Sequence, residues 1–208
     1  MSIRSGKIPL SVNPSFWILA CLLAWMSSST PWQFISWVCV VFSSVLVHEL
    51  GHALTARLWG QNVQIVLGPL GGTTLYGGGR AALSRVKEFV VVLAGPMFGL
   101  FLALACFMLL RNVNVFPEAA YFFSCMVYAN IIWSLFNLLP VHPFDGGKLV
   151  SILLEGIFGP NGLRFSYLLS GLIAIVMTGV CMAYSQIFAA AMLLLCAFES
   201  FRSFRQRR

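Results

Sequence analysis

Apolar stretches separated by short polar or turn-forming segments follow one another along almost the whole chain. They cover residues 15–30, 32–57, 88–110, 119–139, 165–184 and 186–201. A membrane-spanning helix needs about 20 apolar residues, with a range of about 17 to 25. The second to fifth stretches have that length, and the first and last are shorter. The pattern predicts about six transmembrane helices.

Residues 62–80 depart from this pattern. Val63, Ile65 and Leu67 alternate with other residues, and glycine-rich turns follow. Alternation with a period of two is typical of a strand. The predicted fold class is therefore an all-α polytopic membrane protein with a short re-entrant or β-hairpin segment near residues 62–80. A flexible connector would fit this segment equally well.

The composition supports a membrane protein. Of the 208 residues, 59% are hydrophobic and 9% are charged, against about 25% charged in soluble proteins. At this length we expect no appended soluble domain. We expect a single membrane-embedded domain over residues 1–208, with the core of that domain at about 32–150 and extra helices at 15–30 and 165–201. The first stretch also fits a cleavable signal peptide, but a retained helix is favoured.

The positive charges predict an orientation. With a cytoplasmic N-terminus and six crossings, the inner segments would hold every lysine and arginine except Arg111, as the positive-inside rule requires. Both termini are then cytoplasmic. The net charge of +7 is explained by this bias without a nucleic-acid partner. The six cysteines lie far apart without a C-x-x-C pair, and we assign them no role.

His48, Glu49 and His52 lie inside the second apolar stretch, in the sequence HELGH. On a helix these three side chains share one sector of about 100°. Two imidazoles one turn apart can hold one zinc ion, and the glutamate then lies beside the attacking water. Three polar residues at a helix interface are the alternative. Because ionisable groups inside a membrane are costly, the metal site is favoured.

A zinc hydrolase needs a third protein ligand. Asp145 is the only aspartate in the chain, and it lies with His142 in NLLPVHPFDGGKL, residues 137–149. The prolines and glycines of this segment predict a helix break, on the same side of the membrane as His52. Asp145 could be a turn residue before Gly-Gly, but zinc ligation is the better interpretation in so acid-poor a chain.

These motifs resemble the site-2 protease family of intramembrane zinc metalloproteases, in a compact form without PDZ or CBS domains. HELGH is followed about ninety residues later by N-x-x-P-x-x-P-x-D-G. LAGPMFG at 93–99 and LGPLGG at 67–72 resemble two further family segments. The resemblance implies one Zn²⁺ held by His48, His52 and Asp145, Glu49 as the catalytic acid/base, and Asn137 near the reacting carbonyl.

Two positions depart from the family pattern. His142 stands where the family commonly has proline, and Gly99 appears where an asparagine often follows A-G-P. His142 could be a loop residue, an alternative ligand or a pH-sensitive gate. Asn137 could be an oxyanion donor, or it could cap the broken helix.

The implied function is hydrolysis of peptide bonds in or near transmembrane segments, as in regulated intramembrane proteolysis. The implied partners are a single-span membrane protein substrate and the lipid bilayer. A non-catalytic zinc-binding scaffold or a metal transporter is the alternative, which Glu49 disfavours because neither needs a base between the histidines. We expect a bacterial cytoplasmic membrane, with the active site toward the cytoplasm.

Overall fold

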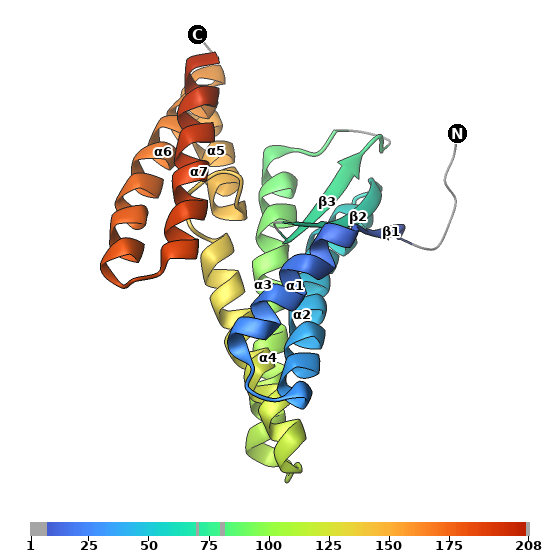
Figure 1. Cartoon of the computed structure of the whole chain (residues 1–208). Coiled ribbons are helices and arrows are strands. Elements are labelled where there is room, and N and C mark those ends of the chain that lie inside the picture. The colour runs from blue at the N-terminus through green and yellow to red at the C-terminus, as the bar shows by residue number, and fades with distance from the viewer. Residues whose placement is uncertain (1–7, 70, 80–81, 207–208) are drawn as a thin grey trace. The chain divides into compact units, whose positions relative to one another are not determined.

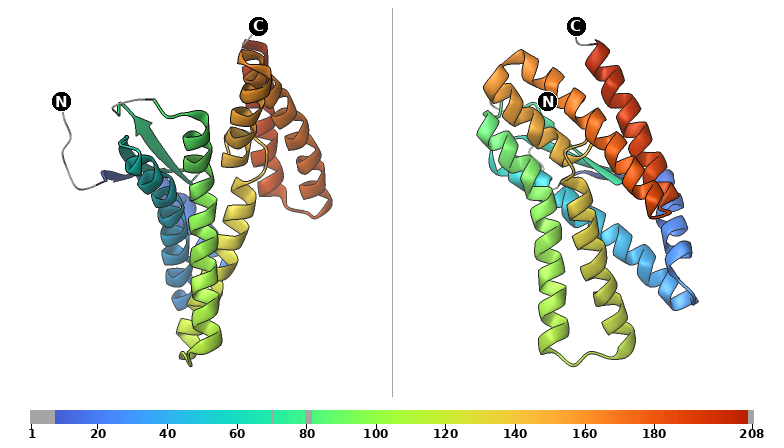
Figure 2. Two further views of the ribbon diagram at one scale, coloured as in Figure 1. Left: turned by 180° about the vertical axis from the view of Figure 1, so that it is seen from behind. Right: turned by 90° about the vertical axis from the view of Figure 1, so that its left-hand side faces the viewer.

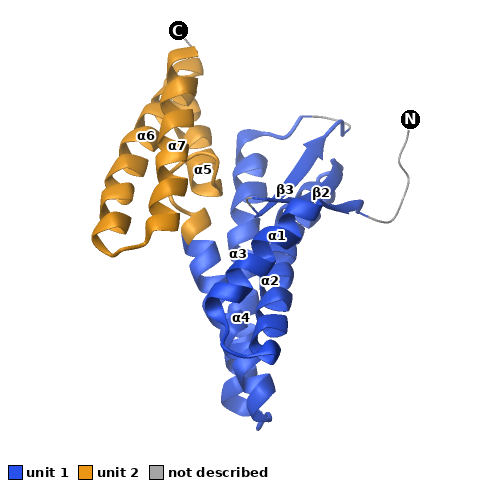
Figure 3. Cartoon of the chain, viewed as in Figure 1, with its two compact units in different colours: residues 1–135 blue, residues 136–208 orange. Residues whose placement is uncertain are grey.

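The computed structural model describes residues 8–69, 71–79 and 82–206. The chain divides into two compact units, residues 1–135 and residues 136–208 (Figure 3). Arg80, the last residue of the predicted hairpin segment, lies outside the described residues, as do the terminal cations at positions 4, 7, 207 and 208.

The first unit consists of a small sheet and four helices (Figure 1). The strands are β1 (Leu10–Val12), β2 (Asn62–Gly68) and β3 (Gly71–Gly77). The helices are α1 (Pro14–Ser27), α2 (Pro31–Leu58), α3 (Arg85–Asn112) and α4 (Pro117–Asn137), whose last two residues fall in the second unit.

Helices α2 and α3 each begin at a residue whose side chain caps the first turn. The Thr30 hydroxyl accepts a hydrogen bond from the backbone N–H of Gln33, and Pro31 occupies the first turn of α2. The Ser84 hydroxyl accepts from Lys87 N–H at the start of α3. Side-chain caps of this kind satisfy N–H groups that have no partner within the helix.

The sheet has the order β1-β2-β3. β1 pairs with β2 in parallel, and β2 pairs with β3 antiparallel with Asn62 opposite Gly77 and Gly68 opposite Gly71. Ile65 and Leu67 are buried and pack with Phe16 of α1 and Val45 of α2. The sheet therefore lies against α1 and α2, which places β3 beside the HELGH segment.

The second unit contains α5 (Asp145–Phe158), α6 (Pro160–Ala183) and α7 (Ile187–Gln206). α6 and α7 run side by side as a hairpin (Figure 2). The core joins Val141 and Phe144 from the segment before α5 to Ala174 of α6 and Leu193 of α7.

The predicted fold class is confirmed. In the described part of the chain, α2, α3, α4, α6 and α7 are long and apolar enough to cross a membrane, close to the predicted six. The first apolar stretch forms the 14-residue α1. The hairpin predicted near residues 62–80 is the β2–β3 pair. β1 and α5 were not predicted as elements.

Candidate active site and metal centre

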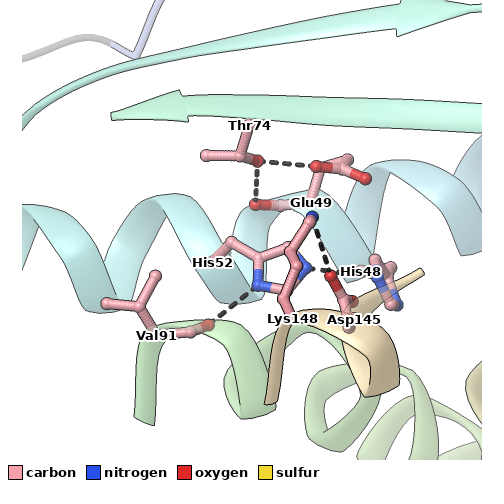
Figure 4. Close-up of polar contacts among 7 residues, drawn as sticks. All are labelled: His48, Glu49, His52, Thr74, Val91, Asp145 and Lys148. Atoms are coloured by element: carbon pink, nitrogen blue, oxygen red, sulfur yellow. Dashed lines mark hydrogen bonds and ion pairs between the residues drawn. The ribbon is translucent and has the colours of Figure 1, made fainter. Parts of the chain in front are cut away.

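His48, Glu49 and His52 lie on α2 where it packs against α3 and the sheet (Figure 4). All three side chains are buried. The sequence prediction that they share one sector of a helix is matched by this arrangement: the two imidazoles contact each other, and the carboxylate of Glu49 lies next to them toward β3.

The two histidines have a geometry suited to a metal. Nε2 of His48 and Nε2 of His52 are 3.2 Å apart. Two nitrogens bound at about 2.0 to 2.1 Å to one tetrahedral zinc lie about 3.3 Å apart. The observed spacing therefore fits two ligands of the same ion.

A carbonyl on α3 orients His52. The distance from His52 Nδ1 to the backbone oxygen of Val91 is 2.8 Å. Because a carbonyl only accepts hydrogen bonds, Nδ1 carries the proton and the lone pair of Nε2 is left for a metal. Metal-bound histidines typically donate their second ring N–H in this way.

Glycines bring α3 close to this face of α2. A Cβ atom at Gly51 would lie 2.5 Å from the carbonyl oxygen of Ala94. A Cβ atom at Gly95 would collide with the His52 ring and lie 2.9 Å from His48 Nε2. Gly95, in the segment 93–99, thus leaves the space that both imidazoles occupy.

Strand β3 covers Glu49 from the other side. The Thr74 hydroxyl lies 2.6 Å from Glu49 Oε2 and 3.0 Å from the Glu49 carbonyl oxygen. A Cβ atom at Gly72 would collide with the Glu49 side chain. The sequence prediction missed Thr74, for which the only available signal was a threonine pair within an expected strand.

Asp145 belongs to the second unit, where it is the first residue of α5. Its Oδ1 is 3.1 Å from Lys148 Nζ, one turn along the same helix (Figure 4). Cβ atoms at Gly146 and Gly147 would collide with the backbone of the segment that leads into α5. The Gly-Gly pair therefore lets that segment fold back onto the first turn of the helix. The ligand role of Asp145 stays a prediction.

His142 lies in the segment before α5, within a network of serine hydroxyls. Its Nε2 is 2.9 Å from Ser151 Oγ and 3.4 Å from Ser166 Oγ, and its backbone N–H donates to Ser170 Oγ at 2.7 Å. Burial, and secondarily the charge of Lys148, lowers the pKa of His142 to about 4. An imidazole that stays neutral between pH 5 and 8 does not favour the pH-gate interpretation. The serines were missed by the sequence prediction.

Asn137 is the last residue of α4 and belongs to the second unit. α4 ends at this residue, which agrees with the helix break predicted for the segment 137–149. Its role, either near a reacting carbonyl or at the helix end, stays a prediction.

The chain is similar to known proteases in sequence and fold. Residues 36–121 and 114–179 match the model of peptidase family M50. Stage IV sporulation protein FB of Bacillus subtilis is 32% identical over 150 residues, which is 71% of this chain and 48% of that protein. A putative zinc metalloprotease of Synechocystis sp. is 29% identical over 178 residues, 76% of this chain and 45% of that protein. The chain thus spans about half the length of these curated relatives.

A solved structure shares the fold. The site-2 protease from Methanocaldococcus jannaschii has a TM-score of 0.62 to this chain at 20% identity. The likeness covers 99% of this chain and 93% of that one.

Proposed function

The chain belongs to peptidase family M50, the family of site-2 proteases, and we propose that it hydrolyses peptide bonds in or near the transmembrane segments of other membrane proteins. The observation that carries this proposal is the histidine pair on α2, whose Nε2 atoms are 3.2 Å apart beside Glu49. The family membership confirms the resemblance predicted from the HELGH and DG motifs.

Zinc is the metal implied, because several homologues carry the name zinc metalloprotease. We propose one ion per chain, held by His48, His52 and Asp145. The histidine spacing and the carbonyl behind His52 support two of these ligands. For Asp145 the support is the DG motif itself and the chemistry of a carboxylate, which is a common third ligand.

Glu49 is the proposed acid/base. When bound, zinc supplies a Lewis acid that lowers the pKa of a coordinated water toward about 7 and polarises a carbonyl oxygen. Glu49 would take a proton from the attacking water as the water oxygen bonds to the carbonyl carbon. It would then deliver that proton to the peptide nitrogen as the C–N bond breaks, which leaves a carboxyl group and an amine. Asn137 is proposed to donate a hydrogen bond to the carbonyl oxygen as negative charge develops there.

The proposed substrate is a single-span membrane protein, cleaved as in regulated intramembrane proteolysis. A peptide bond in a helix is shielded, so the substrate has to become extended near Glu49. β3 is the last strand in the sheet order of the described residues. Its outer edge can add an extended chain through backbone hydrogen bonds, which tolerate varied side chains.

The chain is a multi-pass integral membrane protein, because five of its described helices are long and apolar enough to span and its family is one of membrane proteases. We propose a bacterial cytoplasmic membrane with both termini and the active site on the cytoplasmic side. The concentration of lysine and arginine in the expected inner segments supports that orientation.

Metal content and cleavage, measured together on purified proteins, test this function. We expect about one zinc per chain in the wild type and in Glu49→Gln, which keeps both histidines. Cleavage of single-span membrane peptides should be lost in Glu49→Gln, and Asp145→Ala should lose zinc and cleavage together. Bound zinc without cleavage of any peptide would support a scaffold, and an absence of zinc would contradict both functions.

A further inference from the structure

Thr74 lies on the face of β3 that is turned toward α2. Side chains along a strand alternate between its two faces, so Gly72, Thr74 and Tyr76 share one face and Thr73 and Leu75 share the other. Thr73 and Leu75 are exposed, whereas the members of the first set are partly buried. Thr74 is opposite Ile65 of β2, which is buried against the helices.

The Thr74 hydroxyl binds the carboxylate of Glu49. It lies 2.6 Å from Oε2 and 3.0 Å from the backbone oxygen of the same residue (Figure 4). A hydroxyl has one proton to donate. Because the carboxylate oxygen is the nearer of the two acceptors, the proton is directed to it.

Gly72 brings the strand into contact with the stem of the same side chain. A Cβ atom at position 72 would collide with Cγ of Glu49, so the backbone of β3 lies directly against it. One strand residue thus limits where the stem can lie, and another binds an oxygen at its end. A free glutamate side chain has three rotatable bonds, and these two contacts reduce the orientations that it can adopt.

We propose that Thr74 is a positioning residue for catalysis, which holds the carboxylate of Glu49 in the orientation required for proton transfer. This inference rests on the proposed function, because it assigns a partner to the proposed acid/base. It adds a residue from the sheet to a site otherwise built from motifs on helices.

The hydrogen bond also links the orientation of the base to the strand. Glu49 is held by β3, and β3 is the strand at whose outer edge an extended substrate is proposed to pair. A substrate that fixes the strand therefore also fixes the hydroxyl that orients the base. The loss of this hydroxyl should slow the chemical step and leave substrate binding intact, since the backbone edge of β3 is unchanged.

Thr74→Val tests the proposal, because valine keeps the shape and the strand preference of threonine and removes the hydroxyl. We expect kcat to fall about 10- to 100-fold, the size of effect that small misplacements of a catalytic group produce, with KM and zinc content unchanged. Thr74→Ser restores the hydroxyl and should recover most of kcat. Thr178→Val, which removes a hydroxyl that bonds to Ala174 O within α6, is the matched control and should keep wild-type kcat.

The outcomes separate this inference from the proposed function. A wild type that cleaves, together with a Thr74→Val protein of equal kcat, overturns the positioning role alone. Equal losses in Thr74→Val and Thr74→Ser also overturn it, because the hydroxyl would then not be the active feature. If Thr74→Val does not retain zinc, kcat is compared between Thr74→Ala and Thr74→Ser instead, because these two proteins also differ by the hydroxyl. A wild type without zinc or cleavage overturns the proposed function and this inference with it.

Discussion

Gly95 is the residue that leaves the imidazoles of α2 their space. An added methyl group would collide with the His52 ring and approach His48 Nε2 to 2.9 Å. The Cβ atom of an alanine is held by the backbone of a packed helix and cannot shift. The imidazole therefore has to move. His52 cannot move far without losing its contact with the Val91 carbonyl at 2.8 Å.

We therefore expect Gly95→Ala to weaken zinc binding by about 10- to 100-fold, as does the loss of groups that orient metal ligands. Competition with a zinc chelator on the purified protein measures this change. Gly179→Ala in α6 is the control, because a Cβ atom there would meet nothing within 4 Å and an alanine favours the helix. Zinc affinity in Gly95→Ala equal to that of the control would contradict the steric role.

Among the residues of the site, the sequence could place together those whose relative directions depend on a single helix. His48, Glu49 and His52 could be placed together because the helical period alone sets their directions. Thr74 could not, because its contact with Glu49 depends on the register of β3 and on how the sheet packs against α2. The same holds for Ser151 and Ser166, which meet His142 only through the folding of three separate segments.

Among the elements, the apolar helices and the β2–β3 hairpin were predictable, whereas α5 and β1 were not. The predicted stretch 119–139 corresponds to α4 at 117–137, and the predicted break after it is present. α5 was not predicted, since Gly146 and Gly147 disfavour a helix. In the structure these glycines allow the preceding segment to lie close to the first turn of α5. β1, with three residues, is too short for any alternation to show.

His142 ties the segment before α5 to α5 and α6, and this connection predicts a pH dependence. The ordinary pKa is about 6.5 in an unfolded chain, and burial lowers it to about 4 in the folded protein. Between these values the unfolded chain binds more protons than the folded one. The free energy of unfolding therefore falls as the pH falls from 6.5 toward 4.

We expect this loss to be smaller in His142→Gln, because glutamine does not titrate and its amide can bond to the same serines. Thermal unfolding of the detergent-purified proteins between pH 7.5 and 4.5 measures the difference. The two proteins should have Tm values that converge as the pH falls, with the wild type losing more. Parallel curves would show that His142 is not the group responsible.

For the whole molecule, the charge distribution predicts the orientation in the membrane. Arg111 at the end of α3 is the only cation expected outside, whereas Arg202 and Arg205 at the end of α7 are expected inside. The positive-inside rule rests on such differences between short flanking segments. The division of the chain into two compact units, in contrast, has no counterpart in composition, and the sequence did not indicate it.

Single cysteines introduced into a cysteine-free variant test the orientation. We expect Asn114→Cys, in the segment between α3 and α4, to react with a membrane-impermeant maleimide in intact cells. Ser203→Cys, near the end of α7, should react only after lysis. The reverse pattern would invert the topology and move the proposed active site to the other face of the membrane.

The shortness of α1 has a consequence for the surrounding lipid. Its 14 residues rise about 21 Å, whereas the hydrocarbon core of a bilayer is about 30 Å thick. α1 exposes the apolar side chains Trp17, Ile18, Leu22 and Trp25, which is the surface that we expect acyl chains to cover. A bilayer adapts to a short apolar surface by thinning locally. Headgroups and water should then penetrate more deeply beside this helix than elsewhere, which lowers the cost of holding a substrate chain in an extended form.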